Sequence, residues 1–233
     1  MIGTFINTGA ILAGSAVGAL AGARLPGKMR QTVLHGIGLV TFLIGFQMAL
    51  RTQNALIVLG AILLGGITGE ALRIEDRLEM LGDYIQEKLS GGSGQHMFAE
   101  GFVTASLVFC VGPMAILGSI SDGLTGDYSL LSIKAVMDCF ASVAFAASMG
   151  WGVALSAVSI LIYQGAITLF ASSLSSVLND AMIAEMTATG GLLIIGIGLR
   201  LLDIAQLRLA NFVPAIAIAP LILALIPIVE RLF

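Results

Sequence analysis

Long apolar runs separated by short polar segments follow one another along the whole chain. Eight of them have roughly the 20 residues that an α-helix needs to cross a bilayer. The sequence therefore predicts an all-α polytopic membrane protein with about eight transmembrane helices. Seven are possible, because the fifth and sixth runs are divided only near Gly150-Trp151-Gly152. The expected spans are 3–23, 31–50, 54–71, 99–120, 129–149, 152–173, 185–203 and 209–229.

A segment after the third run has a different pattern. Its apolar residues recur at three- to four-residue spacing with charged residues between them, which predicts an amphipathic helix over 72–89. The Gly- and Ser-rich residues 90–94 then predict a flexible linker. We expect three parts: spans one to three in 1–71, the cytoplasmic amphipathic helix and linker in 72–98, and spans four to eight in 99–233.

Basic residues are distributed unequally between the two sides of an eight-span chain. One side receives Arg24, Lys28, Arg30, Arg73, Arg77, Lys88, Arg200 and Arg208, and the other receives Arg51, Lys134 and Arg231. Because Lys and Arg are enriched in cytoplasmic loops, the first side is expected in the cytoplasm. Both termini are then expected outside.

Composition narrows the function classes. The chain is 58% hydrophobic and 11% charged, against about 25% charged residues in a typical soluble domain. Its net charge of −3, without a basic tract, gives no footprint for nucleic acid. The sequence contains neither a Gly-rich phosphate loop nor a His-Glu-x-x-His motif, and its two histidines lie far apart. We expect no enzyme activity and no cofactor.

The most informative residue is Asp138, near the middle of the fifth span. A carboxylate at that depth costs about 2.5–3.5 kcal/mol on insertion scales, and it usually marks a pathway, a relay or a buried pair. Lys134 lies four residues earlier and Ser142 four residues later, on the same helix face. Asp138 is therefore a candidate ion or metal ligand with Lys134 as counter-charge. The alternative is a structural ion pair that fixes helix packing.

Other candidates lie in the fourth span and in the turn that follows it. Pro113 removes a helical hydrogen bond, so Gly112-Pro113 predicts a break that either exposes carbonyls to a bound ion or only kinks the helix. Asp122 lies in a polar turn, where it could attract cations or cap the ends of spans four and five. Asn7 and Gln164 are polar residues at membrane depth, whose role is either ligation or packing.

Glycines mark helix faces that can pack closely. Gly14, Gly18 and Gly22 form such a face on span one, and Gly65 and Gly69 form another on span three. Each could receive a helix of the same chain or of a second copy, which would give a homo-oligomer. The segments 38–45 and 191–198 both carry glycines seven residues apart, so spans 1–3 and 6–8 are a possible inverted repeat, a plan common among transporters.

Several segments resemble the YqgA/YdfK family of uncharacterised bacterial inner-membrane proteins. They are the opening Gly3-Thr4-Phe5-Ile6-Asn7, the stretch Gly65-Gly66-Ile67-Thr68-Gly69-Glu70, and residues 122–138. The resemblance covers nearly the whole chain and implies a location in the bacterial inner membrane. It supplies no mechanism.

The chain also shows a more distant similarity to small manganese-exporter-type transporters. It lies in the segment Met137-Asp138-Cys139-Phe140-Ala141-Ser142 and in residues 190–198. That resemblance implies two inverted three-helix halves, with Asp138 at a cation site. The chain departs from the pattern because span one has Asn7 but no acid, so a second carboxylate would have to come from Asp122 or Glu70.

These features favour a secondary transporter or permease for a small solute, most plausibly a cation. Asp138 and Lys134 would carry the mechanism, with Gln164 and the Gly112-Pro113 break supplying neutral ligands. The alternative is a non-transporting membrane scaffold or accessory subunit that binds a partner through its glycine faces and the 72–89 helix.

Overall fold

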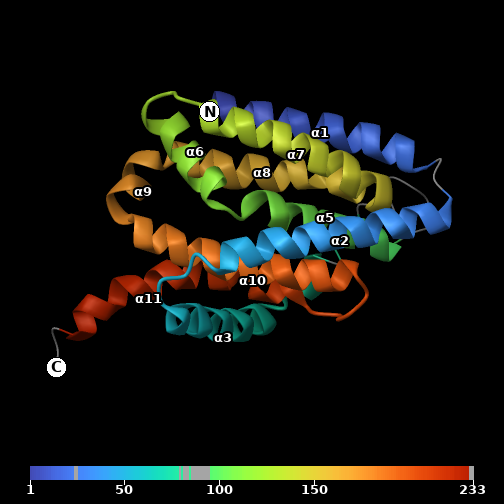
Figure 1. Ribbon diagram of the computed structural model, residues 1–233. Helices are drawn as coiled ribbons and strands as arrows, with labels where there is room; N and C mark the ends of the chain where they lie inside the picture. Colours follow the sequence, from blue (N-terminus) through green and yellow to red (C-terminus); the bar gives the residue numbers. More distant parts are fainter. Residues whose placement is uncertain (24–25, 79, 81–83, 85–94, 231–233) are drawn as a thin grey trace.

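The computed structural model describes residues 1–23, 26–78, 80, 84 and 95–230, and all regular structure in these ranges is helical (Figure 1). The amphipathic segment begins as a helix at residues 74–78, but most of it and the Gly/Ser linker lie outside the described residues. The elements are α1 (Ile2–Gly22), α2 (Gly27–Ala49), α3 (Ala55–Leu72), α5 (Gln95–Cys110), α6 (Pro113–Leu124), α7 (Ser129–Met149), α8 (Gly152–Leu169), α9 (Ala171–Val177), α10 (Asp180–Leu201), the 3-10 turn η1 (Leu209–Phe212) and α11 (Pro214–Glu230).

The described helices include seven segments long and apolar enough to cross a membrane. An eighth crossing is formed if α5 and α6 are counted as one broken span, since the pair is bent by 63°. The prediction of a polytopic all-α membrane protein with about eight spans is thus confirmed. Gly150, with a φ of 79°, forms the turn that separates α7 from α8.

The bend in the fourth span lies at Gly112-Pro113, as the sequence predicts. Gly112 has a φ of 141°, a left-handed conformation that favours glycine, and Pro113 opens α6 at its first turn. The expected span 99–120 therefore consists of two helices, α5 and α6, that meet at this break. The end of span six differs as well: α8 ends at Leu169, and a separate short helix, α9, follows it.

Span seven starts earlier than its apolar pattern indicates. Asn179 accepts a hydrogen bond from the Met182 N–H at 2.9 Å and so caps α10, which begins at Asp180 rather than at 185. Side-chain caps satisfy the free N–H groups of a first helical turn, and this allows α10 to include polar residues before its apolar run.

Glycines bring α1 against α7. A Cβ built on Gly14, Gly18 or Gly22 would lie 2.4, 2.2 or 2.1 Å from the carbonyl oxygens of residues 139, 143 and 147, so the two backbones touch. The residue numbers of the contacts increase together along both helices, so α1 and α7 run parallel. The first glycine face therefore receives a helix of the same chain.

Two antiparallel pairs form a second group of helices. Gly45 of α2 packs on Gly191 of α10, and Gly38 packs beside Leu201, so α2 and α10 run in opposite directions. Gly65 and Gly69 of α3 pack on Ala215 and Asn211, so the second glycine face is also filled within the chain. An oligomer would need other surfaces.

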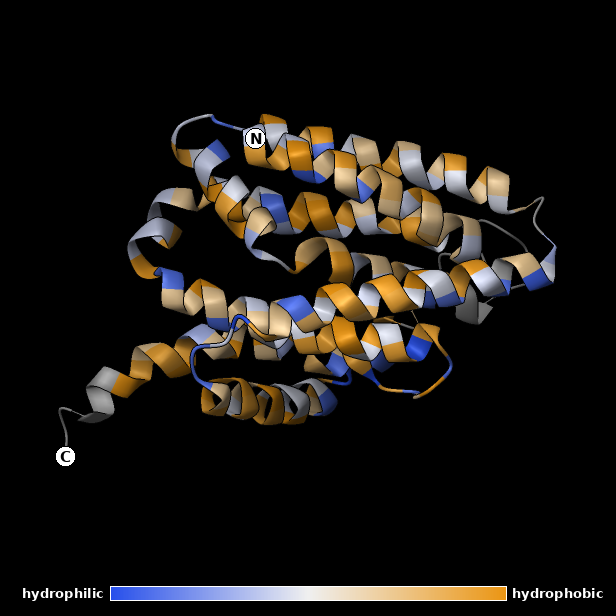
Figure 2. Ribbon diagram, in the orientation of Figure 1, coloured by the Kyte–Doolittle hydropathy of each residue, from blue (hydrophilic) through white to orange (hydrophobic). Residues whose placement is uncertain are grey.

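The helices thus form two bundles. Bundle 1 comprises α1, α5, α6, α7 and α8, and bundle 2 comprises α2, α3, α10 and α11; contacts between them are sparse and are made chiefly by α2 and α10. In Figure 1 bundle 1 is the upper group and bundle 2 the lower group. Figure 2 shows long apolar stretches on both, and side chains such as Leu56 and Phe140 are each 74% exposed, as a lipid-facing surface requires.

Helix directions define two ends of the molecule. The Asp122 end holds the start of α1 and α7 and the end of α6 and α8, while the Arg200 end holds the end of α1 and α10 and the start of α2. The start of α1 and the end of α11 lie at the same Asp122 end (Figure 1).

Candidate functional site

Four polar side chains meet inside bundle 1, between α1, α7 and α8. The Lys134 ammonium donates to Oδ2 of Asp138, and Nδ2 of Asn7 donates to the same oxygen at 3.0 Å. Nδ2 of Asn7 also lies 3.4 Å from Oε1 of Gln164. All four residues are at most 7% exposed. We call Asn7, Lys134, Asp138 and Gln164 the polar cluster.

The local structure explains why these residues meet. Lys134 and Asp138 are four residues apart, so they share one face of α7. The close approach of α1 at Gly14 allows the short Asn7 side chain to reach the same carboxylate. Asp138 lies ten residues into the 21-residue α7, at about half of its length. The close, parallel packing of α1 on α7 therefore places the Asn7 amide against a carboxylate near the middle of α7.

Several polar atoms near the polar cluster have unused hydrogen-bonding capacity. Oδ1 of Asn7, Nε2 of Gln164 and Oγ of Ser142 are buried and have no hydrogen-bond partner within the described ranges. Leaving a buried polar group unsatisfied costs about 1–3 kcal/mol. Ser142 is fully buried and lies one turn from Asp138, so the polar track expected from the sequence is present on α7. The cluster can accept further polar contacts.

The buried polar residues continue toward the Asp122 end. Oγ1 of Thr4 lies 3.5 Å from Oγ1 of Thr168, one turn before Asn7 on α1. Beyond it, Asp122 accepts from the Gly3 N–H at 3.1 Å and pairs with the Met1 amino group at 3.0 Å. Asp122 therefore caps α1, and the expectation that it caps spans four and five is wrong. Negative charge at a helix N-terminus is favourable, which explains this choice of partner.

Lys134 balances the charge of Asp138, and among the residues that the structure describes no second acid contacts this carboxylate. Asp122 is bound to the start of α1, and Glu70 is bound to Arg208 and Asn211 in bundle 2. Within the part of the chain that the structure describes, no group of three or more His, Cys, Asp or Glu residues could hold a metal. The two-carboxylate site implied by the manganese-exporter resemblance is therefore absent there.

The broken span borders the polar cluster on one side. The Phe109 ring, just before the break, has its centre 6.0 Å from the Lys134 nitrogen, within the range of a cation–π contact. The break itself faces bundle 2, because the atom nearest to a Cβ on Gly112 is Cε of Met48 at 3.9 Å. Phe109 thus lies beside Lys134, while the break at Gly112-Pro113 lies toward the other bundle.

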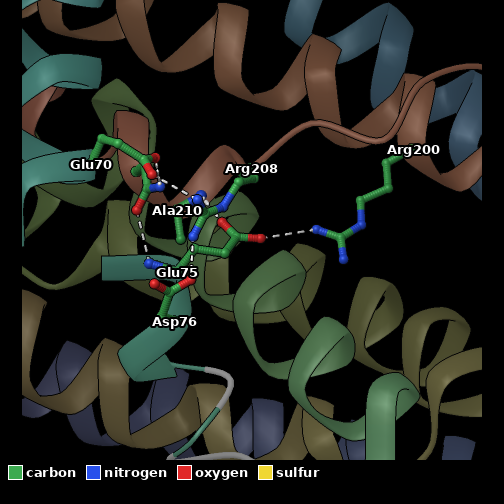
Figure 3. A network of polar contacts seen from close by, with 7 residues as sticks. Glu70, Glu75, Asp76, Arg200, Arg208 and Ala210 are labelled. Atoms are coloured by element: carbon green, nitrogen blue, oxygen red, sulfur yellow. Dashed lines mark hydrogen bonds and ion pairs between the residues drawn. The ribbon is translucent and has the colours of Figure 1, made fainter. Parts of the chain in front are cut away.

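A second polar network lies at the Arg200 end (Figure 3). Arg200 pairs with Glu75 and Glu100, each at 3.3 Å, and Arg208 pairs with Glu70 at 2.7 Å and with Asp76. Asp203, the acid nearest to Arg200 in sequence, lies 3.8 Å from His35 instead. The partners of Arg200 are about 100 residues or more away in sequence, so spacing along one helix gave no signal for them.

Sequence reasoning also missed Glu185, which is 1% exposed in α10. Its carboxylate accepts from Oγ1 of Thr52 at 2.7 Å and from the N–H groups of Gln53 and Asn54 at 2.7 and 3.0 Å. It therefore fixes the loop between α2 and α3 to α10. An acid beside an apolar run was the available signal, since such an acid needs partners when it is buried.

We expect Glu185→Ala to lower the free energy of unfolding by about 2 kcal/mol, because Thr52, Gln53 and Asn54 lose hydrogen bonds to a charged acceptor. Amide hydrogen exchange should rise at Gln53 and Asn54, and thermal unfolding of the purified protein should measure the stability. Asp180→Ala, at an exposed position in the first turn of α10, is the control and should change stability little. Equal effects of the two substitutions would contradict the assigned role of Glu185.

Comparison with known proteins agrees with the membrane architecture. The chain is 29% identical over 230 residues to the uncharacterised membrane protein YdfK of Bacillus subtilis strain 168, covering 97% of each chain. It is 30% identical over 222 residues to the uncharacterised protein YqgA of Escherichia coli strain K12, covering 94% of each. No solved structure matches it significantly. Residues 2–224 match the protein family of unknown function DUF554, and the chain therefore belongs to that family.

Proposed function

We propose that this membrane protein is a secondary transporter for a small solute, specifically a cation, and that the polar cluster is its binding site. The observation that carries the proposal is a mid-membrane carboxylate surrounded by unused polar atoms. A purely structural pair would gain by satisfying all its neighbours, whereas Asn7, Gln164 and Ser142 keep free capacity next to Asp138. Ionisable groups at this depth commonly serve transport pathways.

Lys134 has a defined task in this proposal. Its ammonium forms an ion pair with the Asp138 carboxylate when no substrate is bound, so this carboxylate is never unpaired in a low-dielectric site. An incoming cation would replace that ammonium at Asp138, and the amide oxygens of Asn7 and Gln164 would supply neutral ligands. Because only one carboxylate is available, a monovalent cation suits the cluster better than a divalent one.

The arrangement of helices supports an inverted repeat of spans 1–3 and 6–8. Segments 38–45 and 191–198 pack on each other in opposite directions, and their contacts are reciprocal. A Cβ on Gly45 would lie 2.6 Å from the Ile195 nitrogen, and a Cβ on Gly198, which matches Gly45 in the repeat, would lie 2.8 Å from the nitrogen of Phe42, which matches Ile195. Such reciprocity is expected across a two-fold axis in the membrane plane, a symmetry that many secondary transporters use.

The distribution of basic residues supports one orientation of the protein in the membrane. Eight crossings give both termini the same side, and the excess of Lys and Arg at the Arg200 end supports a cytoplasmic position for that end. The protein would then lie in the bacterial inner membrane with both termini outside. The buried polar residues between Asp122 and Asp138 would lead inward from the outer surface.

Flux measurements in proteoliposomes test this function. We expect the purified protein to carry at least one of the tracers ²²Na⁺, ⁸⁶Rb⁺ or ⁵⁴Mn²⁺, and Asp138→Asn to lower that flux to the level of empty liposomes. The reason is that an amide keeps the shape but cannot hold a cation by charge.

Asp127→Asn is the matched control for this substitution. Asp127 is exposed between α6 and α7, and hydrogen bonds from Ser129 lower its pKa. It should keep full flux. Full flux by Asp138→Asn, or no flux of any tracer by the parent protein, would overturn the proposed function.

A further inference from the structure

Arg200 connects the two bundles at one end of the molecule. It belongs to the last turn of α10 in bundle 2, and its Nε lies 3.3 Å from Oε1 of Glu100 in α5 of bundle 1. Its Nη1 lies 3.3 Å from Oε1 of Glu75. The Arg200 side chain is only 22% exposed. Since contacts between the bundles are sparse elsewhere, this guanidinium is a main polar link between them at the Arg200 end.

Glu75 holds the guanidinium from the side of bundle 2. Its other carboxylate oxygen accepts from the Ala210 N–H at 2.7 Å, and its own N–H donates to Oδ1 of Asn211 at 2.9 Å. Figure 3 shows Glu75 between Ala210 and Arg200. Glu75 is 5% exposed and therefore has little freedom to follow a moving partner. The contact that can open without disturbing bundle 2 is the ion pair between Arg200 and Glu100.

Arg208, in the same view, has contacts of a different kind. It pairs with Glu70 and Asp76, which both belong to the α3 side of bundle 2, and its side chain is 47% exposed. Within the described part of the chain, Arg208 forms no ion pair with a residue of bundle 1. The chain therefore contains two neighbouring arginines, of which one bridges the bundles and one does not.

The Arg200–Glu100 pair lies beside a small cavity between the bundles. The cavity has a volume of about 90 Å³ and is lined by residues of both, among them Leu34, Met149 and Arg200. Met149 ends α7, the helix that carries Asp138, and it is 3% exposed. Loss of the ion pair would widen this cavity and expose Met149 to water from the Arg200 end.

We propose that Arg200 is a latch that closes the Arg200 end by tying α10 to Glu100, and that its release from Glu100 is a step of the transport cycle. The second part rests on the proposed function. The first part concerns the contact alone and can be tested without any flux.

Cysteine accessibility tests the latch. In a background with Cys110→Ala and Cys139→Ala, we introduce Met149→Cys and measure its reaction with the membrane-impermeant reagent MTSET, in vesicles that expose the Arg200 end. We expect slow labelling in this parent and about tenfold faster labelling after Arg200→Gln, because one partner of a largely buried pair is lost. Glu100→Gln should have the same effect.

Arg208→Gln is the matched control, because it removes the same charge at the same end without breaking a bond between bundles. It should leave the labelling rate unchanged. The latch is overturned if Arg200→Gln labels as slowly as the parent, or if Arg208→Gln speeds labelling equally. The proposed function fails separately, through the flux of Asp138→Asn. If the latch holds and the flux test fails, Arg200 is a bundle contact without a role in transport.

Discussion

Replacing Lys134 with methionine is expected to lower the free energy of unfolding by about 3–5 kcal/mol, because it leaves the Asp138 carboxylate buried without its ion partner. The double substitution Lys134→Met with Asp138→Asn should recover most of that loss, since no uncompensated charge remains. Four proteins are compared in one detergent: the parent, Lys134→Met, Asp138→Asn and the double variant. Their thermal and denaturant unfolding would give the coupling energy of the pair. We expect a coupling above about 2 kcal/mol.

The same four proteins separate structure from transport. The double variant should fold stably and carry no cation, because it lacks the charge that binds substrate. Lys28→Met, at an exposed position near the start of α2, is the control for removal of a lysine and should change stability by less than about 0.5 kcal/mol. A double variant that transports normally would make Lys134 and Asp138 a packing device only and would exclude the polar cluster as the binding site.

Much of the architecture can be predicted from the sequence, because lipid imposes it. Backbone groups in hydrocarbon must bond within their own segment, so each apolar run of sufficient length becomes a helix. The break at Gly112-Pro113 follows from one residue that lacks an N–H and another that adopts a φ of 141°. Lys134 and Asp138 meet because residues four apart share a face.

What could not be predicted are partners from distant segments. Asn7 and Gln164 are 157 residues apart, and only the packing of α1 against both α7 and α8 brings Asn7 to Asp138 and Gln164 to Asn7. Asp122 is at a helix end, where many partners are available, and the three-dimensional fold selects the start of α1. For the same reason, the partners of Glu185 and of Arg200 could not be predicted from the sequence. Each depends on which helices become neighbours, and apolar periodicity does not encode this for spans that are apolar all round.

Glycine positions carry more of that neighbour information than the polar residues do. The glycines at 14, 18 and 22 mark the seam with α7, and those at 65 and 69 mark the seam with α11 and η1. From the sequence alone these faces could equally receive a second copy of the chain. The parallel α1–α7 seam also sets the register of Asn7 against Asp138, so the chemistry of the cluster depends on backbone contact two to four turns away.

The Gly18→Leu substitution should therefore damage both stability and function. A Cβ at this position would lie 2.2 Å from the Val143 carbonyl oxygen, and backbone cannot be displaced as a flexible side chain can. Helix α1 would have to move away from α7, at a cost of about 3 kcal/mol, the upper part of the range for overpacked cores. The 3.0 Å bond from Asn7 to Asp138 lies on the same two helices and should lengthen or break. Thermal unfolding and tracer flux measure the two effects.

Gly9→Leu provides the comparison, because a Cβ on Gly9 meets nothing within 4 Å. The leucine would face lipid, and glycine is a poor helix former, so stability should stay the same or rise by up to about 1 kcal/mol. If Gly18→Leu were as stable as Gly9→Leu, the α1–α7 contact could not be as close as its glycines indicate. If Gly18→Leu lost stability but kept its flux, Asn7 would have no part in the site, and Asp138 would hold its substrate without α1.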